Sequence, residues 1–160
     1  MEPSKTKDLP IAFGRITDKN TELVRALNLA VFPVVYQSSF YQSLPNYDNF
    51  TRLAFYNDIL VGAISCREET KDNEKCLYIL ILGVLEPYRR YKVGSKLIEE
   101  VLKIVEGRKD LKYIYLHTQV GNETALKFYK KYGFEVTETL KDYYHDIQPA
   151  DCHILKKNLQ

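Results

Sequence analysis

Two adjacent arginines stand where their charge could hold an anion. Arg89 and Arg90 follow an apolar run that ends at Leu85, and they precede an amphipathic pattern that begins at Val93. The start of a helix leaves backbone N–H groups without intrahelical acceptors and carries the positive end of the helix dipole. A basic turn at such a start suits a pyrophosphate group. Before the following helix is considered, a solvated charged turn explains the same two residues equally well.

The segments on either side of this turn carry clear strand and helix patterns. Residues 77–85 are almost wholly apolar and include isoleucine and valine, which predicts a central strand covered on both faces. From Val93 to Glu106, apolar residues recur at helical spacing, which predicts a helix that stops at Gly107. The turn is therefore expected to join a buried strand to the first turn of a helix.

The rest of the chain alternates in the same way. In the first half, the pattern predicts a strand at 11–16 and then a helix that Thr17 or Asp18 begins and Pro33 ends. The apolar residues of this helix fall on one stripe, namely Leu23, Val24, Leu27 and Val31. A short helix and loop at 36–47, strands at 51–56 and 59–67 around an Asn57-Asp58 turn, and a polar turn at 68–75 are expected to follow. In the second half, the pattern predicts a strand at 112–118, a helix at 122–132 closed by Gly133, and strands at 134–139 and 151–156. This order predicts an α/β fold with a mixed sheet and helices on both faces, in a single domain of residues 1–160.

Composition excludes several classes of function. The chain has 160 residues, and its net charge of +2 is the small difference between 23 basic and 21 acidic residues, which argues against bulk binding to nucleic acid. Cys66, Cys76 and Cys152 are odd in number and widely spaced, so we expect no disulfide framework and no metal site. The chain also lacks an apolar leader and a run long enough to span a membrane, so we expect a cytoplasmic protein with no membrane partner.

Several separated segments resemble one known family. Arg89 to Gly94 is similar to the Arg/Gln-x-x-Gly-x-Gly/Ala pyrophosphate loop of the GNAT superfamily of acetyl-CoA-dependent acetyltransferases, with Lys92 in place of the first glycine. The further segments resemble N-alpha-acetyltransferases of the NatE type, the San-like catalytic subunits. They are Phe32-Pro33-Val34 with Tyr36, Tyr78-Ile79, Tyr115-Leu116-His117, Asn122-Glu123-x-Ala125-x-x-Phe128-Tyr129, and Tyr143-Tyr144 with Ile147-x-Pro149-Ala150.

The resemblance implies a fold, a co-substrate and a set of site residues. It implies the GNAT fold, with a mixed, mostly antiparallel central sheet, and it implies acetyl-CoA as co-substrate without a metal. Tyr78 and His117 take the catalytic positions. The positions implied for the coenzyme are Leu82, Gly83, Val84, Arg89, Arg90, Tyr91, Lys92, Val93, Gly94, Ser95, Asn122 and Tyr129. Those implied for a peptide are Phe32, Pro33, Val34, Tyr36, Leu80, Tyr143, Tyr144 and Ile147.

The chemistry suits these residue types. A peptide α-amine has a reference pKa of about 7.7 to 8.0 against about 10.4 for lysine, so deprotonating it near pH 7 costs about 1 kcal/mol rather than about 4.6. His117, with a reference pKa of about 6.5, could accept that proton directly or through a water held by Tyr78. Backbone N–H groups near Leu82 could stabilise the oxyanion, and Tyr129 could protonate the departing thiolate. Taken alone, Tyr78 is also readable as a buried strand aromatic and His117 as a structural histidine.

The implied peptide site predicts a substrate class. Phe32, Pro33 and Val34 would line an apolar pocket for an initial methionine, and Tyr36, Tyr143 and Tyr144 would bind the peptide backbone. An apolar second residue would fit beside Ile147, with graded selectivity because one methylene changes binding by only about 1 to 3 kcal/mol. The resemblance further implies association with the catalytic and scaffold subunits of the NatA complex and with the ribosome.

Two other functions stay open on the sequence. The chain could be a weakly active or inactive GNAT subunit that docks on a ribosome-associated NatA complex, because Lys92 departs from the coenzyme loop. If the turn requires a positive φ there, a lysine carries strain of about 1 to 3 kcal/mol. The chain could also be a GNAT enzyme for a small amine such as a polyamine or a sugar. Kinase, dehydrogenase and hydrolase motifs are absent from the sequence.

Overall fold

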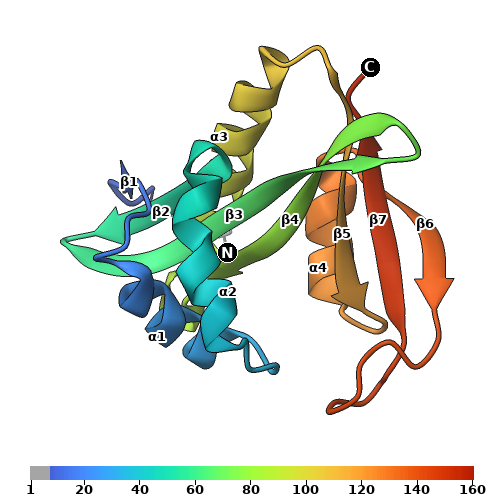
Figure 1. Cartoon of the computed structure of the whole chain (residues 1–160). Coiled ribbons are helices and arrows are strands. Elements are labelled where there is room, and N and C mark those ends of the chain that lie inside the picture. Colours follow the sequence, from blue (N-terminus) through green and yellow to red (C-terminus); the bar gives the residue numbers. More distant parts are fainter. Residues whose placement is uncertain (1–7) are drawn as a thin grey trace, which may run out of the picture. The chain divides into compact units, whose positions relative to one another are not determined.

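The computed structural model describes residues 8–160, and Figure 1 shows how their helices and strands are arranged. The elements are β1 (Ala12–Gly14), α1 (Thr21–Val31), α2 (Ser38–Ser43), the 3-10 helix η1 (Leu44–Phe50), β2 (Thr51–Tyr56), β3 (Ile59–Lys71), β4 (Glu74–Val84), the 3-10 helix η2 (Glu86–Tyr91), α3 (Val93–Glu106), β5 (Leu111–Gln119), α4 (Glu123–Lys131), β6 (Glu135–Leu140) and β7 (Cys152–Asn158).

Within the described residues the strands form one hydrogen-bonded sheet in the order β1-β2-β3-β4-β5-β7-β6. The β4–β5 pair is parallel, whereas β1–β2, β2–β3, β5–β7 and β6–β7 are antiparallel. The predicted mixed, mostly antiparallel sheet is therefore confirmed. The parallel pair arises because α3 returns the chain to the sheet between β4 and β5, as parallel neighbours require a crossover connection.

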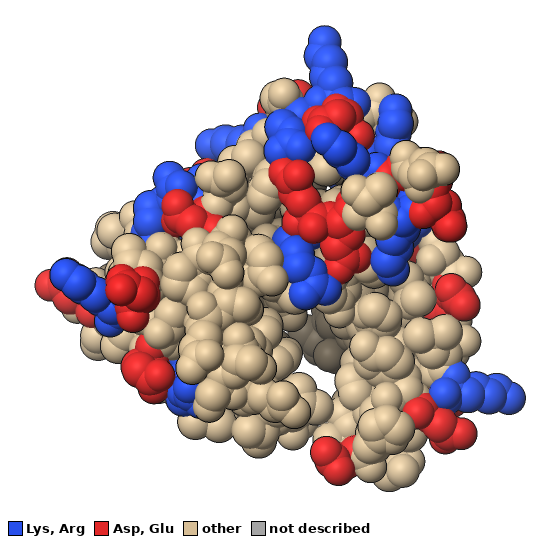
Figure 2. All heavy atoms as spheres, in the orientation of Figure 1, with Lys and Arg blue, Asp and Glu red and all other residues tan. Residues whose placement is uncertain are grey.

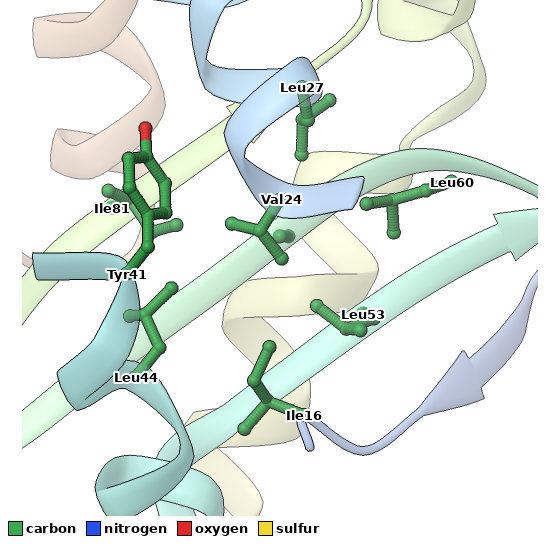
Figure 3. Close-up of a cluster of buried hydrophobic side chains, with 9 residues drawn as sticks. Ile16, Val24, Leu27, Tyr41, Leu44, Leu53, Leu60 and Ile81 are labelled. Carbon is green, nitrogen blue, oxygen red and sulfur yellow. The ribbon is translucent and has the colours of Figure 1, made fainter. Parts of the chain in front are cut away.

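The chain divides into two compact units, and β3 and β4 run through both. Of the described residues, unit 1 contains 8–66 together with Ile81–Ile104. Its core is a cluster of buried side chains from α1, α2, β2, β3 and β4, of which Val24, Leu53 and Ile81 are labelled in Figure 3. On α3, Val93 and Leu97 lie against the backbone of β3. Helices thus cover both faces of the strands of unit 1.

The first helix begins later than expected. Asn20, not Thr17 or Asp18, is the N-terminal flanking residue of α1, and the Asn20 side chain instead accepts a hydrogen bond from the Thr17 backbone N–H at 2.8 Å. The predicted stripe is wrong at Leu23, which is 49% exposed, while Val24 and Leu27 are buried. The predicted end is confirmed, because α1 stops at Val31, before the residue that precedes Pro33.

Unit 2 contains Arg67–Leu80 and Val105–Gln160. Its helix α4 begins as predicted, since the Asn122 carboxamide oxygen accepts a hydrogen bond from the Ala125 N–H at 3.2 Å. The same helix closes at Gly133, whose φ of +89° is the left-handed conformation that glycine adopts without strain. Phe134 is then fully buried, and it starts the chain back into β6.

The predicted polar turn at 68–75 is wrong. Strand β3 continues to Lys71 and β4 begins at Glu74, so only Asp72 and Asn73 form the turn, with φ of +51° and +65°. Two residues with positive φ are the signature of the tight hairpin turn whose twist matches that of its strands. Basic and acidic side chains lie side by side over this hairpin in Figure 2. Among the described residues, Arg108 forms ion pairs with both Glu68 and Asp110.

Two further features bear on the expected classes of function. Cys66, Cys76 and Cys152 are buried and free. Among residues 8–160, no helix is long and apolar enough to cross a membrane.

Candidate active site

Two side chains on neighbouring strands of unit 2 form a hydrogen-bonded acid–base pair. The Tyr78 hydroxyl and His117 Nδ1 are 2.8 Å apart. They meet because β4 and β5 run parallel with Tyr78 opposite Tyr115, so His117, two residues further on, projects from the same face of the sheet. The structure therefore brings together the two residues that the sequence singled out for proton transfer.

Aromatic rings enclose this pair. The Tyr143 ring stacks on the His117 imidazole with 4.9 Å between centroids and 9° between planes, and Tyr144 packs edge-on against Tyr143. The Tyr115 ring lies 4.7 Å from the Tyr78 ring. Burial under these rings, together with the charge of Lys71, holds the pKa of His117 below its ordinary value. The imidazole is accordingly neutral, and able to accept a proton, at physiological pH.

Charged groups next to the pair were not predicted from the sequence. Glu69 accepts a hydrogen bond from the Tyr115 hydroxyl and forms an ion pair with Arg67, with 2.6 Å between Arg67 Nη2 and Glu69 Oε2. The Lys71 ammonium lies 4.4 Å from the centre of the Tyr115 ring. Glu69 and Lys71 lie on the part of β3 that the sequence analysis assigned to a polar turn, and Arg67 is the last residue of the strand predicted at 59–67. The Asp-Asn pair at 72–73 is the signal that could have revealed the hairpin.

The anion turn belongs to unit 1. Arg89 and Arg90 lie in η2, and the Arg89 side chain donates from Nε to the carbonyl oxygen of Val84 at 2.9 Å, which ties the turn to the end of β4. Lys92 then adopts a left-handed conformation with φ of 61° and ψ of 24°, and its carbonyl oxygen accepts the Lys96 N–H. The turn therefore does hold Lys92 at a positive φ, the conformation in which a lysine carries backbone strain. Val93, Gly94 and Ser95 form the first turn of α3, and their backbone N–H groups lie at the N-terminal end of the helix.

The second implied coenzyme segment is α4, in unit 2. Asn122 caps this helix, as described above, so its side chain has a structural role there. Tyr129 is buried, and its ring packs edge-on against Phe128 at 5.1 Å and Phe134 at 5.3 Å between centroids. The structure thus gives both residues local packing partners, and their contacts with a coenzyme stay a prediction.

The implied peptide residues fall in both units. In unit 1, the segment from Phe32 to Tyr36 follows α1, with Phe32 edge-on to Tyr36 at 6.1 Å and Tyr36 stacked on Phe40 at 4.6 Å. In unit 2, Tyr144 donates its N–H to the carbonyl oxygen of Ala150 at 2.8 Å, which closes the β6–β7 loop that carries Tyr143 and Ile147. Leu80 is half-buried on β4. It lies on the same strand face as Tyr78 and Leu82, which are also half-buried. The prediction that β4 is covered on both faces is therefore wrong for this face.

Gly83 sets the position of Phe32 within unit 1. A Cβ atom added at Gly83 would lie 2.8 Å from Phe32 Cζ and 3.0 Å from Val31 Cγ1. The Phe32 ring therefore packs directly on the β4 backbone. We expect Gly83→Ala to lower the free energy of unfolding by about 1 kcal/mol, because an extra methyl group there overpacks the contact.

Thermal unfolding followed by circular dichroism measures this effect, and a loss of about 1 kcal/mol corresponds to about 2 to 4 °C in a chain of this size. Gly121→Ala is the control for added bulk, because a Cβ there would have no neighbour within 4 Å, although its φ of +91° adds backbone strain. An unchanged melting temperature for Gly83→Ala would show that Phe32 does not depend on the bare backbone of β4.

The parallel strand pair with its acid–base couple, and the basic turn that opens a helix, are the features that the sequence analysis expected of an acyltransferase that uses an acyl-coenzyme A donor. Residues 21–134 match the model of the Acetyltransferase (GNAT) family. The chain belongs to that family, which confirms the predicted fold.

Relatives extend the match over nearly the whole chain. The chain is 45% identical to N-alpha-acetyltransferase 50 of Danio rerio over 94% of its own length and 89% of that protein. It is 41% identical to the probable N-acetyltransferase san of Drosophila melanogaster, over 94% and 82%. Among solved structures, it is similar to Arabidopsis thaliana Naa50 in complex with the bisubstrate analogue CoA-Ac-MVNAL, at 43% identity and a TM-score of 0.86, over 93% and 99% of the two chains.

Proposed function

We propose that the protein transfers the acetyl group of acetyl-CoA to the N-terminal α-amine of proteins that keep an initial methionine before a hydrophobic residue. The observation that carries the proposal is the Tyr78–His117 hydrogen bond, which supplies a mild base of the strength an α-amine needs. The relatives support the substrate class. One is named an N-alpha-acetyltransferase, and the Arabidopsis structure holds coenzyme A joined to a peptide that begins Met-Val.

In the proposed reaction the α-amine attacks the thioester carbon directly. The ammonium proton passes to the Tyr78–His117 pair, either directly or through a water that the pair holds. The amine nitrogen then forms a bond to the acetyl carbon and gives up its second proton to solvent. The carbon–sulfur bond breaks, and coenzyme A leaves as the thiol after it takes up a proton, for which Tyr129 is the proposed donor and which solvent returns to Tyr129. The backbone N–H groups near Leu82 would stabilise the transient oxyanion.

The residues of the turn fit the coenzyme. The N–H groups at the start of α3 have no intrahelical acceptors, and the adjacent side chain of Arg90 adds positive charge, which together suit a pyrophosphate. We assign Leu82 to Val84, Arg89 to Ser95, Asn122 and Tyr129 to coenzyme contacts.

The peptide contacts follow from residue chemistry. Phe32, Pro33 and Val34 would contact the methionine side chain, and Leu80 and Ile147 the second residue. The hydroxyl groups of Tyr36, Tyr143 and Tyr144 would hydrogen-bond to the peptide backbone. The stacking of Tyr143 on His117 places one of these residues against the proposed base.

Peptide substrates test the proposal. We expect acetyl-CoA to be turned over with a Met-Leu peptide that has a free amine, and not with the same peptide formylated at its N-terminus. Mass spectrometry should place the acetyl group on the α-amine even when the peptide contains an internal lysine. Turnover with spermidine or glucosamine in place of peptide would instead support the small-amine function.

A second candidate function rests on Lys92. Its left-handed backbone strains the coenzyme turn, which favours a weakly active subunit that docks on the catalytic and scaffold subunits of a NatA complex at the ribosome. In either function we propose a cytoplasmic location, because the substrates are nascent chains. Calorimetric titration with acetyl-CoA separates the two functions, since a docking subunit need not bind the coenzyme.

A further inference from the structure

Three groups pack around the ring of Tyr78. The Tyr115 ring lies 4.7 Å from it at 31° between planes, and His117 meets it edge-on at 5.4 Å. The guanidinium carbon of Arg67 lies 5.6 Å from the ring centre. The phenol that hydrogen-bonds to His117 is therefore held by an arginine and a second tyrosine, and its orientation depends on theirs.

One carboxylate fixes both of these neighbours. Glu69 Oε2 accepts hydrogen bonds from Arg67 Nε at 3.0 Å and from Arg67 Nη2 at 2.6 Å, and Glu69 Oε1 accepts the Tyr115 hydroxyl. Its side chain is only 17% exposed. Burial acts to raise the pKa of Glu69, but the hydrogen bonds from Tyr115 and Arg67 outweigh it and hold the pKa below its ordinary value. The Glu69 carboxylate is therefore charged at physiological pH.

We propose that Glu69 is a positioning residue for the acetyl transfer: through Arg67 and Tyr115 it sets the orientation of Tyr78 and hence the Tyr78–His117 hydrogen bond. This inference rests on the proposed function of that pair. Glu69 holds Arg67 and Tyr115 by hydrogen bonds, and both of these residues pack on the Tyr78 ring, so it acts through these two partners. Small displacements of a proton-transfer group have large effects on rate, because the reacting atoms must meet within a narrow range of distance and angle.

The charges around His117 supply a readout of this arrangement. Lys71 and Glu69 act on His117 from β3 and Glu138 acts from β6, while Tyr78, Tyr143 and Tyr115 pack on it from β4, the β6–β7 loop and its own strand. Lys71 lowers the pKa of His117, whereas Glu69 and Glu138 raise it. Removing the charge of Glu69 and removing that of Lys71 should consequently move the titration of His117 in opposite directions.

The test compares Glu69→Gln with a matched neighbour. We expect Glu69→Gln to lower kcat with a Met-Leu peptide by about tenfold, with little change in KM for acetyl-CoA. Glu68→Gln is the control, because Glu68 precedes Glu69 on the same strand but pairs with Arg108. It should leave kcat unchanged. Tyr115→Phe removes only the hydroxyl that Glu69 holds, and we expect an intermediate loss of kcat.

The titration of His117, followed by NMR of its imidazole, gives a measurement that does not need activity. Glu69→Gln should move its midpoint to lower pH and Lys71→Met to higher pH, and the acid limb of kcat should follow. A wild-type kcat and an unmoved midpoint in Glu69→Gln would overturn the inference. If wild-type protein acetylates no peptide, the proposed function fails, while the His117 titration still decides whether Glu69 governs the pair.

Discussion

The double variant Tyr78→Phe, His117→Ala is expected to acetylate a Met-Leu peptide at least about 100-fold more slowly than wild type, because general-base catalysis contributes about 10²-fold to 10⁴-fold. The two side chains share a hydrogen bond of 2.8 Å between the Tyr78 hydroxyl and His117 Nδ1, so the double variant removes both ends of it. Steady-state kcat/KM, measured with acetyl-CoA near saturation, reports the loss.

The single variants show how the pair acts. Groups that work as a unit are non-additive, so each single variant should lose nearly as much activity as the double variant. Tyr113→Phe is the control, since Tyr113 lies on the same strand but packs under Lys156, with 3.8 Å between the ammonium and the ring centre. Circular dichroism establishes that each variant is folded. Full turnover by the double variant would remove the pair from the mechanism.

The proximity of Tyr78 and His117 could be predicted because it depends on few features of the fold. The apolar run of β4 and the helix that follows it require a crossover, and a crossover places the next strand, β5, parallel to its neighbour. Because Tyr78 and His117 lie on adjacent parallel strands, with Tyr78 opposite Tyr115, their approach follows from the register. The Asn57-Asp58 turn was predictable for a similar reason, since both residues adopt the positive φ that a two-residue hairpin needs.

The charges beside the pair could not be predicted in the same way. Glutamate and lysine are depleted in strands, so the polar residues from Glu68 to Lys75 read as a loop. The strands continue there because tertiary contacts support them: Glu69 bonds to Tyr115 on β5, and Glu68 bonds to Arg108 ahead of β5. Such contacts join residues about 40 positions apart, as for Arg108 and Glu68, and local patterns carry no signal for them. The positioning role proposed for Glu69 therefore needed the structure.

Lys92 has opposing effects on the turn before α3, one from its backbone conformation and one from its charge. The sequence shows a lysine where the family loop has glycine, and the structure shows the left-handed backbone that glycine would adopt freely, with φ of 61°. A Cβ in this conformation crowds the following carbonyl oxygen, at a cost of about 1 to 2 kcal/mol. The ammonium group works in the opposite sense, because it adds positive charge to a turn that is proposed to bind pyrophosphate.

We expect Lys92→Gly to raise the melting temperature by about 2 to 4 °C, because about 1 kcal/mol of strain is relieved in a chain of this size. We also expect acetyl-CoA to bind about tenfold more tightly, because strain of about 1.4 kcal/mol in the bound form of the turn weakens binding tenfold and the glycine variant relieves it. Isothermal titration calorimetry measures the second effect. Lys92→Ala separates strain from charge, since it keeps the Cβ and loses the ammonium, and it should bind no more tightly than wild type.

The outcomes also discriminate between the two candidate functions. Micromolar binding by wild type, tightened in Lys92→Gly, supports an active enzyme whose coenzyme turn carries strain. No detectable binding by wild type supports the docking subunit, and recovery of binding in Lys92→Gly would show that this one backbone position is the cause. Equal tightening in Lys92→Ala and Lys92→Gly would contradict the strain argument, because only the glycine variant removes the crowding of the Cβ in the left-handed conformation.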